Sequence, residues 1–453
     1  MARDLTQGRI FHTILLFSLP IIGGNLFQLF YTLADTVIVG RTLGPDALAA
    51  AGSTGIVIYF VLCFVQGLTG GFGICLGHQF GRRNEEGMRQ SIAFSALFCG
   101  AVSLVLTAAL CLLSRRILVW MNTPEEIRAM AYDYMFVILL GTGATVFYNM
   151  ISNILQALGD SRTPLVFLVF SSLLNIVLDL VFILPLKMGV AGAAWATVLS
   201  QLLSAALCTW SGMRKFSVLR LRRRDLRTPR KAVREHLRLG LTMGFQMSVM
   251  CVGQLAMQGA VNAMGAGAIA GYTAAAKVDQ LSVLMNGALG VAVSNFTAQN
   301  CGAQRLDRIR SGVKDSLLLA SLMNAAVCAV ILLCRHLVVP LFVDHPTAEL
   351  DRYAELYFLA VAPFYLLLGV LITYRSAIQS MGNSKAPFAA CVVELTARVG
   401  AATLLAARIG YVGVCLATPL AWIGADLLLI PVYFRMMAGA APQVSAKSGG
   451  QKE

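Results

Sequence analysis

The stretch Gln156-Ala-Leu-Gly-Asp-Ser-Arg-Thr-Pro164 recurs as Gln379-Ser-Met-Gly-Asn-Ser-Lys-Ala-Pro387, and this repetition decides the fold. In both copies a glycine follows an apolar run, polar residues come next, and a proline opens another apolar run. Glycine ends a helix readily and proline is accepted in a first helical turn, so each copy predicts a tight turn between two helices. Because the turn occurs in both halves of the chain, we expect two structurally equivalent halves.

Three further pairs of segments support the repeat, and all pairs are offset by about 221–223 residues. They are Gly189-Val-Ala-Gly-Ala-Ala-Trp-Ala-Thr197 with Gly410-Tyr-Val-Gly-Val-Cys-Leu-Ala-Thr418, Leu43-Gly-Pro-Asp-Ala-Leu-Ala-Ala50 with Met264-Gly-Ala-Gly-Ala-Ile-Ala-Gly271, and the loop at Gly81 with the loop at Gly302. A constant offset over most of the chain indicates a duplicated unit rather than isolated similar turns.

The composition indicates a helical membrane protein with many spans. Of the 453 residues, 57% are hydrophobic and 13% are charged, against about 25% charged in soluble domains. A bilayer core requires about 20 apolar residues per helix, and runs of this length recur along the chain. We predict twelve transmembrane helices, at 15–40, 46–78, 91–113, 131–158, 164–185, 190–211, 239–262, 268–298, 313–334, 353–380, 387–406 and 411–437.

The predicted fold is therefore an all-α polytopic membrane protein of two six-helix repeats. Six is an even number, so both halves enter the membrane in the same sense and are parallel repeats, as in transporters that rock two lobes about a central cavity. The predicted division of the chain is an N-terminal lobe at 1–210, a basic cytoplasmic linker at 211–238, a C-terminal lobe at 239–438, and a disordered cytoplasmic tail at 439–453.

The net charge of +14 does not indicate a nucleic-acid partner, because the basic residues gather in a few segments between the spans. The densest is the linker, which includes Arg222, Arg223 and Arg224. Lys and Arg concentrate in cytoplasmic loops of membrane proteins, so both termini are expected in the cytoplasm. The partners expected are the lipid bilayer and small molecules, and we expect a monomer.

Asp35 is a carboxylate inside the first long apolar run. Such a group costs about 2.5–3.5 kcal/mol on insertion scales and normally faces a bundle interior or an aqueous cavity. Asn175 and Asp179 are four residues apart, on one face of the fifth predicted helix. The second half has Arg398 and Ala402 at the equivalent positions and Ala256 or Met257 opposite Asp35. Only the first lobe carries this acidic group.

Asp35, Asp179 and Thr197 are all expected in the outer half of the membrane, with Asn175 one turn deeper. Asp179 lies fifteen residues after Pro164, which is roughly 22 Å along a helix. Two carboxylates, an amide and a hydroxyl can form an oxygen cage for Na⁺. Two close carboxyl groups can equally share a proton. A purely structural hydrogen-bond network is the third alternative, and the sequence leaves all three open.

Other polar residues within the spans are candidates for a substrate cavity: Asp279, Lys277, Gln254, Gln258, Asn149 and Asn153. A carboxylate such as Asp279 among aromatic and Met residues suits a lipophilic cation. Glu394 and Arg398 are one helical turn apart and predict an ion pair within one helix, and Asp426 is a further intramembrane acid. Pro20, inside the first helix, permits a bend there.

Several functional classes have no supporting motif in this sequence. There is no P-loop for an ATP-driven pump, no HExxH, no nucleophile elbow and no Cys/His metal cluster. We therefore expect a protein that is not an enzyme, has no catalytic residues and needs no cofactor beyond a coupling ion. The segment Gly67-Leu-Thr-Gly-Gly-Phe-Gly73 lies within a span and is interpreted as a helix-packing or hinge segment rather than a phosphate cradle.

The sequence resembles the multidrug and toxic compound extrusion (MATE) family, and its bacterial members in particular. The resemblance covers residues 5–435 and rests on the order and spacing of several motifs: Pro20…Asp35-Thr-Val-Ile-Val-Gly40, Gly159-Asp-Ser-Arg-Thr-Pro164, Asn175…Asp179, Ala275-Ala-Lys-Val-Asp-Gln280 and Gln299-Asn-Cys-Gly-Ala303. It implies a V-shaped, two-lobed antiporter in the bacterial cytoplasmic membrane, with Asp35, Asn175, Asp179 and Thr197 as the coupling-ion site and Pro20 as the bend.

The function implied is secondary active export of cationic lipophilic compounds in exchange for H⁺ or Na⁺ by alternating access. The chain departs from the subgroup whose coupling acids lie in helices seven and ten, since those helices carry Gln254, Gln258, Tyr374 and Arg375 instead. This favours the first-lobe site. The alternative is a lipid-linked oligosaccharide flippase of the same broader superfamily, which is expected to line its cavity with several cations, and Lys277, Arg375 and Arg398 are the only candidates.

Overall fold

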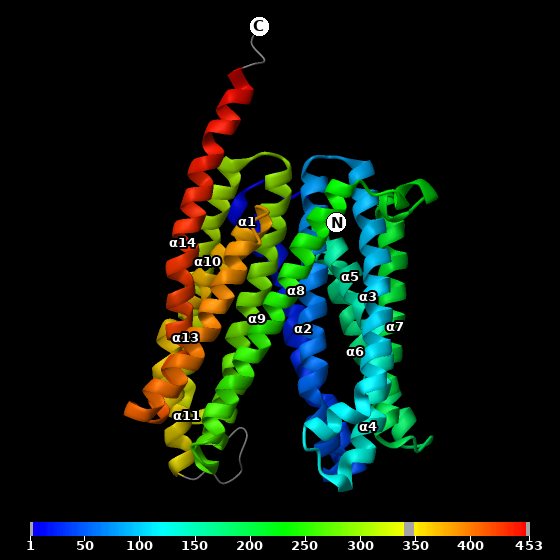
Figure 1. Ribbon diagram of the computed structural model, residues 1–453, viewed down its shortest axis with the longest axis vertical. Helices are drawn as coiled ribbons and strands as arrows, with labels where there is room; N and C mark the ends of the chain where they lie inside the picture. Colours follow the sequence, from blue (N-terminus) through cyan, green and yellow to red (C-terminus); the bar gives the residue numbers. More distant parts are fainter. Residues whose placement is uncertain (1–2, 339–347, 450–453) are drawn as a thin grey trace. The chain divides into compact units, whose positions relative to one another are not determined.

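The computed structural model describes residues 3–338 and 348–449, and these residues are almost entirely helical (Figure 1). The α-helices are α1 (Ile10–Leu43), α2 (Pro45–Gly81), α3 (Glu85–Trp120), α4 (Glu125–Leu140), α5 (Thr142–Ala157), α6 (Arg162–Ile183), α7 (Gly189–Lys215), α8 (Arg230–Asn262), α9 (Ala266–Gly302), α10 (Leu306–Val338), α11 (Ala348–Val361), α12 (Tyr365–Ser380), α13 (Lys385–Ile409) and α14 (Tyr411–Gly449). Short 3₁₀ helices are η1 (Ser217–Leu219), η2 (Arg223–Leu226) and η4 (Ala362–Phe364).

The helices confirm the all-α membrane fold. Among the described residues, eleven helices are long and apolar enough to cross a membrane when α11, η4 and α12 are counted as one helix, Ala348–Ser380. The count is twelve when α4 and α5 are also taken as one bent span. The predicted spans match these helices to within a few residues at most ends. In contrast, α14 continues to Gly449 and so includes part of the segment that was expected to be a disordered tail.

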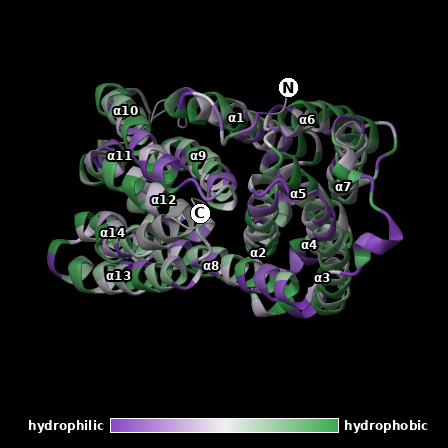
Figure 2. Ribbon diagram, turned by 90° about the horizontal axis from the view of Figure 1, so that it is seen from above, coloured by the Kyte–Doolittle hydropathy of each residue, from purple (hydrophilic) through white to green (hydrophobic). Residues whose placement is uncertain are grey.

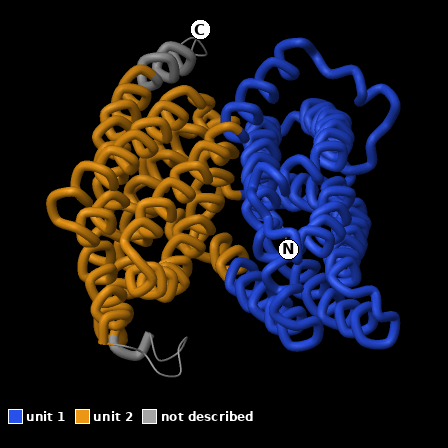
Figure 3. The backbone as a smooth tube through the Cα atoms, turned by 60° about the horizontal axis from the view of Figure 1, so that its bottom comes forward, with its two compact units in different colours: residues 1–4, 23–244 blue, residues 5–22, 245–453 orange. Residues whose placement is uncertain are grey.

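Contacts between residues divide the chain into two units, coloured separately in Figure 3. Unit 1 contains residues 1–4 and 23–244, and unit 2 contains residues 5–22 and 245–453. The division differs from the predicted one in two respects. The first half of α1 belongs to unit 2, and the predicted linker at 211–238 belongs to unit 1, where it forms the end of α7, η1, η2 and the start of α8.

The glycine-rich segment of α2 packs against α8 within unit 1. A methyl group added at Gly67 would lie 2.2 Å from the carbonyl oxygen of Met243, and one added at Gly71 would lie 2.6 Å from the Cα of Gly240. Small residues four apart let two helix backbones approach closely in a membrane. The interpretation of residues 67–73 as a helix-packing segment is therefore confirmed.

The predicted span at 131–158 is broken at Gly141, where the helix axis bends by 43° between α4 and α5. A Cβ atom at Gly141 would lie 2.1 Å from Cγ2 of Val198, on α7. Valine is stiff at χ1 in a helix, so Val198 cannot easily move aside. The bend therefore depends on a glycine that allows the chain to pass this side chain.

We expect Gly141→Ala to destabilise the protein by about 1–3 kcal/mol, the usual cost of overpacking a core. The thermal melting temperature of the purified protein in detergent measures this effect. Gly100→Ala in α3 is the matched control, because a Cβ there meets nothing within 4 Å and alanine favours a helix by about 0.5–1 kcal/mol over glycine. Equal melting temperatures for the two variants would contradict the proposed clash.

The turn between α5 and α6 is capped as the repeated motif predicts. Asp160 Oδ1 accepts hydrogen bonds from the backbone N–H groups of Arg162 at 3.1 Å and Thr163 at 3.0 Å, and Oδ2 accepts from Lys215 Nζ at 3.0 Å. In the second copy, Asn383 Oδ1 accepts from the N–H of Ala386 at 3.2 Å. The two turns therefore use the same cap, but only the first is charged.

The charged cap predicts an acid-dependent loss of stability. Burial alone would raise the pKa of Asp160, but hydrogen bonds from Thr163 and the nearby Lys215 outweigh it and lower the pKa. A carboxyl group whose pKa is lowered by folding stabilises the protein at pH values above its unfolded pKa of about 3.9. This stabilisation is lost as the pH falls through the folded pKa. Asp160→Asn gives the first turn the uncharged cap of the second repeat. We expect this change to reduce the fall in melting temperature between pH 7 and pH 3. An unchanged fall would contradict this assignment.

In unit 1, the basic segments lie at the same end as the start of the chain. The N–H of Arg3 donates to the carbonyl oxygen of Gly159 at 2.9 Å, and Arg89 Nη1 donates to the carbonyl oxygen of Arg220 at 2.9 Å. These contacts bring the α2–α3 loop, the α5–α6 turn and the α7–α8 segment to one end of the unit. In Figure 2 the α7–α8 segment is coloured hydrophilic. This clustering is what the positive-inside rule requires.

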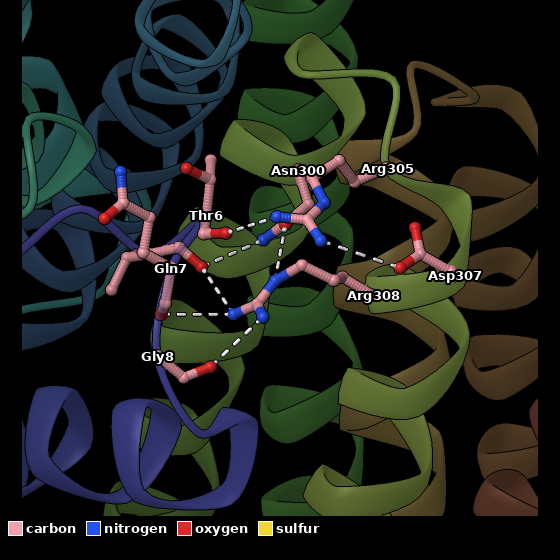
Figure 4. Close-up of polar contacts among 8 residues, drawn as sticks. Thr6, Gln7, Gly8, Asn300, Arg305, Asp307 and Arg308 are labelled. Atoms are coloured by element: carbon pink, nitrogen blue, oxygen red, sulfur yellow. Dashed lines mark hydrogen bonds and ion pairs between the residues drawn. The ribbon is translucent and has the colours of Figure 1, made fainter.

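In unit 2, the residues before α1 are bound to the α9–α10 turn (Figure 4). Arg308 donates to the carbonyl oxygens of Gln7 and Gly8, each at 3.1 Å, and Arg305 donates to that of Thr6 at 3.1 Å. Arginine carries five donors in a fixed plane, so one side chain can satisfy several backbone acceptors at once. The start of the chain is therefore attached to the basic end of unit 2.

Candidate functional site

Asp35 of α1 and Asp179 of α6 are neighbours within unit 1, close enough for their carboxyl groups to interact with each other. Asp179 is fully buried. Each carboxyl group also has one buried oxygen, Oδ1, without a hydrogen-bond partner. Two neighbouring carboxyl groups cannot both be charged without strong repulsion, so a shared proton or a bound cation would stabilise the pair.

Asn175 and Thr197 complete this cluster. With the amide of Asn175 oriented so that all its neighbours are satisfied, its nitrogen donates to Asp179 Oδ2 at 2.9 Å and its oxygen accepts from the backbone N–H of Thr197 at 3.0 Å. The amide orientation is assigned from this network. Asn175 is 1% exposed, so its amide is held in place. The structure thus brings together the four residues that the sequence selected, on α1, α6 and α7.

A cavity of about 220 Å³ lies beside the pair, within unit 1. Its wall includes Asp35, Tyr31, Tyr134, Thr197 and Gln201. Tyr31 hydrogen-bonds Thr197, and both tyrosines lie close enough to Asp35 and Asp179 to interact with their charge. Carboxyl groups beside aromatic rings suit a positively charged ligand.

Sequence reasoning missed both tyrosines. Tyr31 precedes Asp35 by four residues and therefore lies on the same face of α1, which was a usable signal. Tyr134 comes from α4 and had no such signal, because only tertiary packing brings it to α1. Thr145 and Gln201 were also missed; they hydrogen-bond to each other at 2.6 Å in the cavity wall.

The predicted substrate-cavity residues of unit 1 have structural partners. Asn153 donates to Thr69 Oγ1 at 3.1 Å and so joins α5 to α2. Asn149 donates to the carbonyl oxygen of Thr145 at 2.9 Å, within its own helix. Neither residue lines the cavity beside Asp35.

In unit 2, the predicted residues do not form one cluster. Asp279 of α9 accepts a hydrogen bond from the hydroxyl of Tyr365 at 2.6 Å and lies near Tyr357 and Arg398. Lys277 and Gln254 have exposed side chains. Gln258 donates to Asn262 at 2.9 Å, on the same helix. Only Asp279 lies among aromatic residues.

The predicted ion pair between Glu394 and Arg398 is wrong. Glu394 of α13 instead accepts a charge-assisted hydrogen bond from Arg375 of α12. Both side chains are about 5% exposed. The i,i+4 spacing permits the intrahelical pair, but Arg375 reaches Glu394 from the neighbouring helix. Arg398 is left with a buried Nε that has no partner.

Pro20 lies inside α1, three residues before the point where the helix passes from unit 2 to unit 1. Proline removes one backbone donor from a helix and permits a bend. The next residues include Gly23, where an added Cβ would meet nothing within 4 Å. The role of Pro20 as the bend remains a prediction.

Comparisons with known proteins identify one family. The family model MatE matches residues 20–181 and 243–421. The chain is 32% identical over 386 residues to the probable multidrug resistance protein YpnP of Bacillus subtilis (strain 168), covering 84% of this chain and 85% of that protein. It is 25% identical over 421 residues to the probable multidrug resistance protein NorM of Thermotoga maritima, covering 91% and 88%.

A similar solved structure is described as a crystal structure of MATE in complex with MaL6. It has a TM-score of 0.91 and 23% sequence identity, and the match covers 97% of this chain and 99% of that one. At this identity the likeness shows the fold alone. The expected fold of the family is confirmed.

Proposed function

Because the chain belongs to the MatE family of multidrug and toxic compound extrusion transporters, we propose that it is a secondary antiporter that exports lipophilic organic cations in exchange for H⁺ or Na⁺. It is a multi-pass membrane protein, and the members of its family are transporters rather than enzymes. Relatives named multidrug resistance proteins support drug export as the direction of transport.

The observation that carries the proposal is the contact between Asp35 and Asp179. Two neighbouring carboxylates repel each other, and each has a buried oxygen without a hydrogen-bond partner. Binding of one monovalent cation lowers the charge of the pair from −2 to −1. A proton shared between the two neighbouring carboxyl groups would need no further ligand. Na⁺ would use the same oxygens with those of Asn175 and Thr197.

The cavity beside the pair supports a competition between ion and substrate. Asp35 belongs both to the pair and to the cavity wall, so a bound organic cation and the coupling ion would neutralise the same charge. At about 220 Å³ the cavity is smaller than the 300–1,000 Å³ of typical drug pockets. It therefore accommodates the cationic part of a substrate. Asp279, beside Tyr365, is the candidate cation contact in unit 2.

Alternating access would follow from exchange at this site. Neutralising Asp35 removes a charge from α1, and Pro20 gives that helix a point at which to bend. The basic ends described above support a cytoplasmic location for both termini under the positive-inside rule, and the proposed location is the bacterial inner membrane. One charge crossing a potential of 100 mV supplies about 2.3 kcal/mol. No further cofactor or protein partner is needed.

The proposal is tested by expressing the protein in a drug-sensitive bacterial strain and measuring ethidium accumulation. We expect lower accumulation than with the empty vector, and we expect the difference to disappear when a protonophore and a sodium ionophore collapse both gradients. Accumulation equal to that of the empty vector, at confirmed membrane expression and with several cationic dyes, would contradict drug export.

A further inference from the structure

Unit 2 contains a buried ion pair that leaves one donor unused. Arg375 uses Nη2 for Glu394 and Nη1 for a weak contact with the sulfur of Met250 at 3.6 Å. Its Nε is buried and has no hydrogen-bond partner. A guanidinium with a buried, unused N–H can accept another anion without leaving its place.

Asp426 of α14 is an acid without a hydrogen-bond partner that interacts with the charge of Arg375. It is 5% exposed, and both carboxyl oxygens are buried without a hydrogen bond. The groups of the neighbouring helices that interact with its charge are Arg375 of α12, Glu394 of α13 and the hydroxyl of Tyr374. Within the part of the chain that the structure describes, Asp426 is therefore a carboxyl group with both oxygens buried and neither in a hydrogen bond.

The charges of this cluster do not balance. Arg375 is positive, Glu394 and Asp426 are acids, and Arg375 already bonds Glu394. A buried carboxylate without a partner is strongly disfavoured, so Asp426 takes up one positive charge. A hard cation such as Na⁺ would need several further oxygen ligands around Asp426. A proton requires only the carboxyl group itself.

We propose that Asp426 is an exchangeable proton site of unit 2, and that loss of its proton lets Arg375 bind Asp426 as well as Glu394. In the protonated state, Asp426 is neutral and Arg375 pairs with Glu394, as it does in the structure. When the proton leaves to water, Asp426 becomes an acceptor for the unused Nε of Arg375. The two acids then share one guanidinium that connects α12, α13 and α14.

This site is separate from Asp35 and Asp179, which belong to unit 1, and it does not depend on the proposed antiport. Its residues lie on other helices than the first-lobe cluster and were not part of the predicted coupling site. If both sites operate, the protein carries two proton-binding positions, one in each unit. Exchange at Asp426 would change which helices of unit 2 are connected by an ion pair.

The test is infrared difference spectroscopy of the purified full-length protein during a titration from pH 6 to pH 10. Protonated carboxyl groups absorb separately from carboxylates. We expect Asp426→Asn to remove one carboxyl group from the titrating signal, whereas Asp351→Asn, which removes an exposed acid of unit 2, leaves the signal unchanged. Asp426→Asn imitates the protonated form, so it is expected to fold.

A second measurement follows the arginine. The guanidinium bands of Arg375 are expected to shift as wild-type protein is titrated and to stay constant in Asp426→Asn. An Asp426→Asn spectrum identical to that of the wild type would overturn the proposal, and so would an Asp426 signal without any change in the guanidinium bands. The double variant Asp35→Asn/Asp179→Asn should keep the infrared signal of Asp426. If that variant also retained efflux, the antiport proposal would fail while the Asp426 proposal still stood.

Discussion

Asp35→Asn and Asp179→Asn are each expected to reduce ethidium efflux from cells to the level of the empty vector. Either change removes one member of the pair of neighbouring carboxyl groups formed by α1 and α6. An amide cannot release a proton and binds a cation more weakly than a carboxylate does. The measurement is the initial rate of ethidium efflux from preloaded cells at matched protein levels.

Three controls distinguish loss of coupling from loss of structure. Asp133→Asn removes an exposed acid of the same unit and should leave efflux unchanged. Asp35→Glu keeps a carboxyl group and should retain part of the activity. The asparagine variants imitate the protonated pair, so their melting temperatures should stay close to that of the wild type. Full efflux in both asparagine variants, with normal ion dependence, would contradict the assignment of the site.

At a pH at which Asp426 is protonated, Glu394→Gln is expected to destabilise the protein by about 3–5 kcal/mol, because it leaves Arg375 charged, buried and without its partner. The two side chains are 6% and 5% exposed, and the solvent that remains cannot screen the charge. Unfolding of the purified protein in mixed micelles with increasing denaturing detergent measures the loss. The double variant Arg375→Met/Glu394→Leu should recover most of it, since replacing both ions by apolar groups is often neutral.

Glu355→Gln is the matched control in the same unit. It removes the partner of Arg335 in an ion pair whose side chains are 31% and 37% exposed. Such exposed pairs contribute about 0–1 kcal/mol, so the expected loss is several times smaller than for Glu394→Gln. Equal losses for the two substitutions would show that burial does not determine the strength of the Arg375–Glu394 pair.

The fold could be predicted largely from the sequence because its determinants are local. Apolar runs of membrane length, and turns such as Gly159-Asp-Ser-Arg-Thr-Pro164, need no knowledge of the tertiary structure. The bend at Gly141 could not be predicted in this way. A glycine within a long apolar run has no distinct signal, and the bend depends on Val198 of α7, which is more than fifty residues away in the sequence.

The candidate site could be predicted where helical periodicity was enough. Asn175 and Asp179 share a face of α6 by their spacing alone, and Asp35 was identified by the cost of burying its charge. Tyr134 and the Arg375–Glu394 pair depend on how neighbouring helices are rotated against each other. The sequence contains no local signal for this rotation, and the i,i+4 rule therefore paired Glu394 with the wrong arginine.

The central claim, that a cation at Asp35 and Asp179 is exchanged for substrate, is tested most directly in proteoliposomes loaded with a cationic dye. Dye transport is measured after a pH jump and, separately, after a Na⁺ pulse, in the wild type and in Asp35→Asn/Asp179→Asn. We predict that one of the two gradients drives dye transport by the wild type, and that neither gradient does so in the double variant. Gradient-driven transport by the double variant at the wild-type rate would contradict the claim.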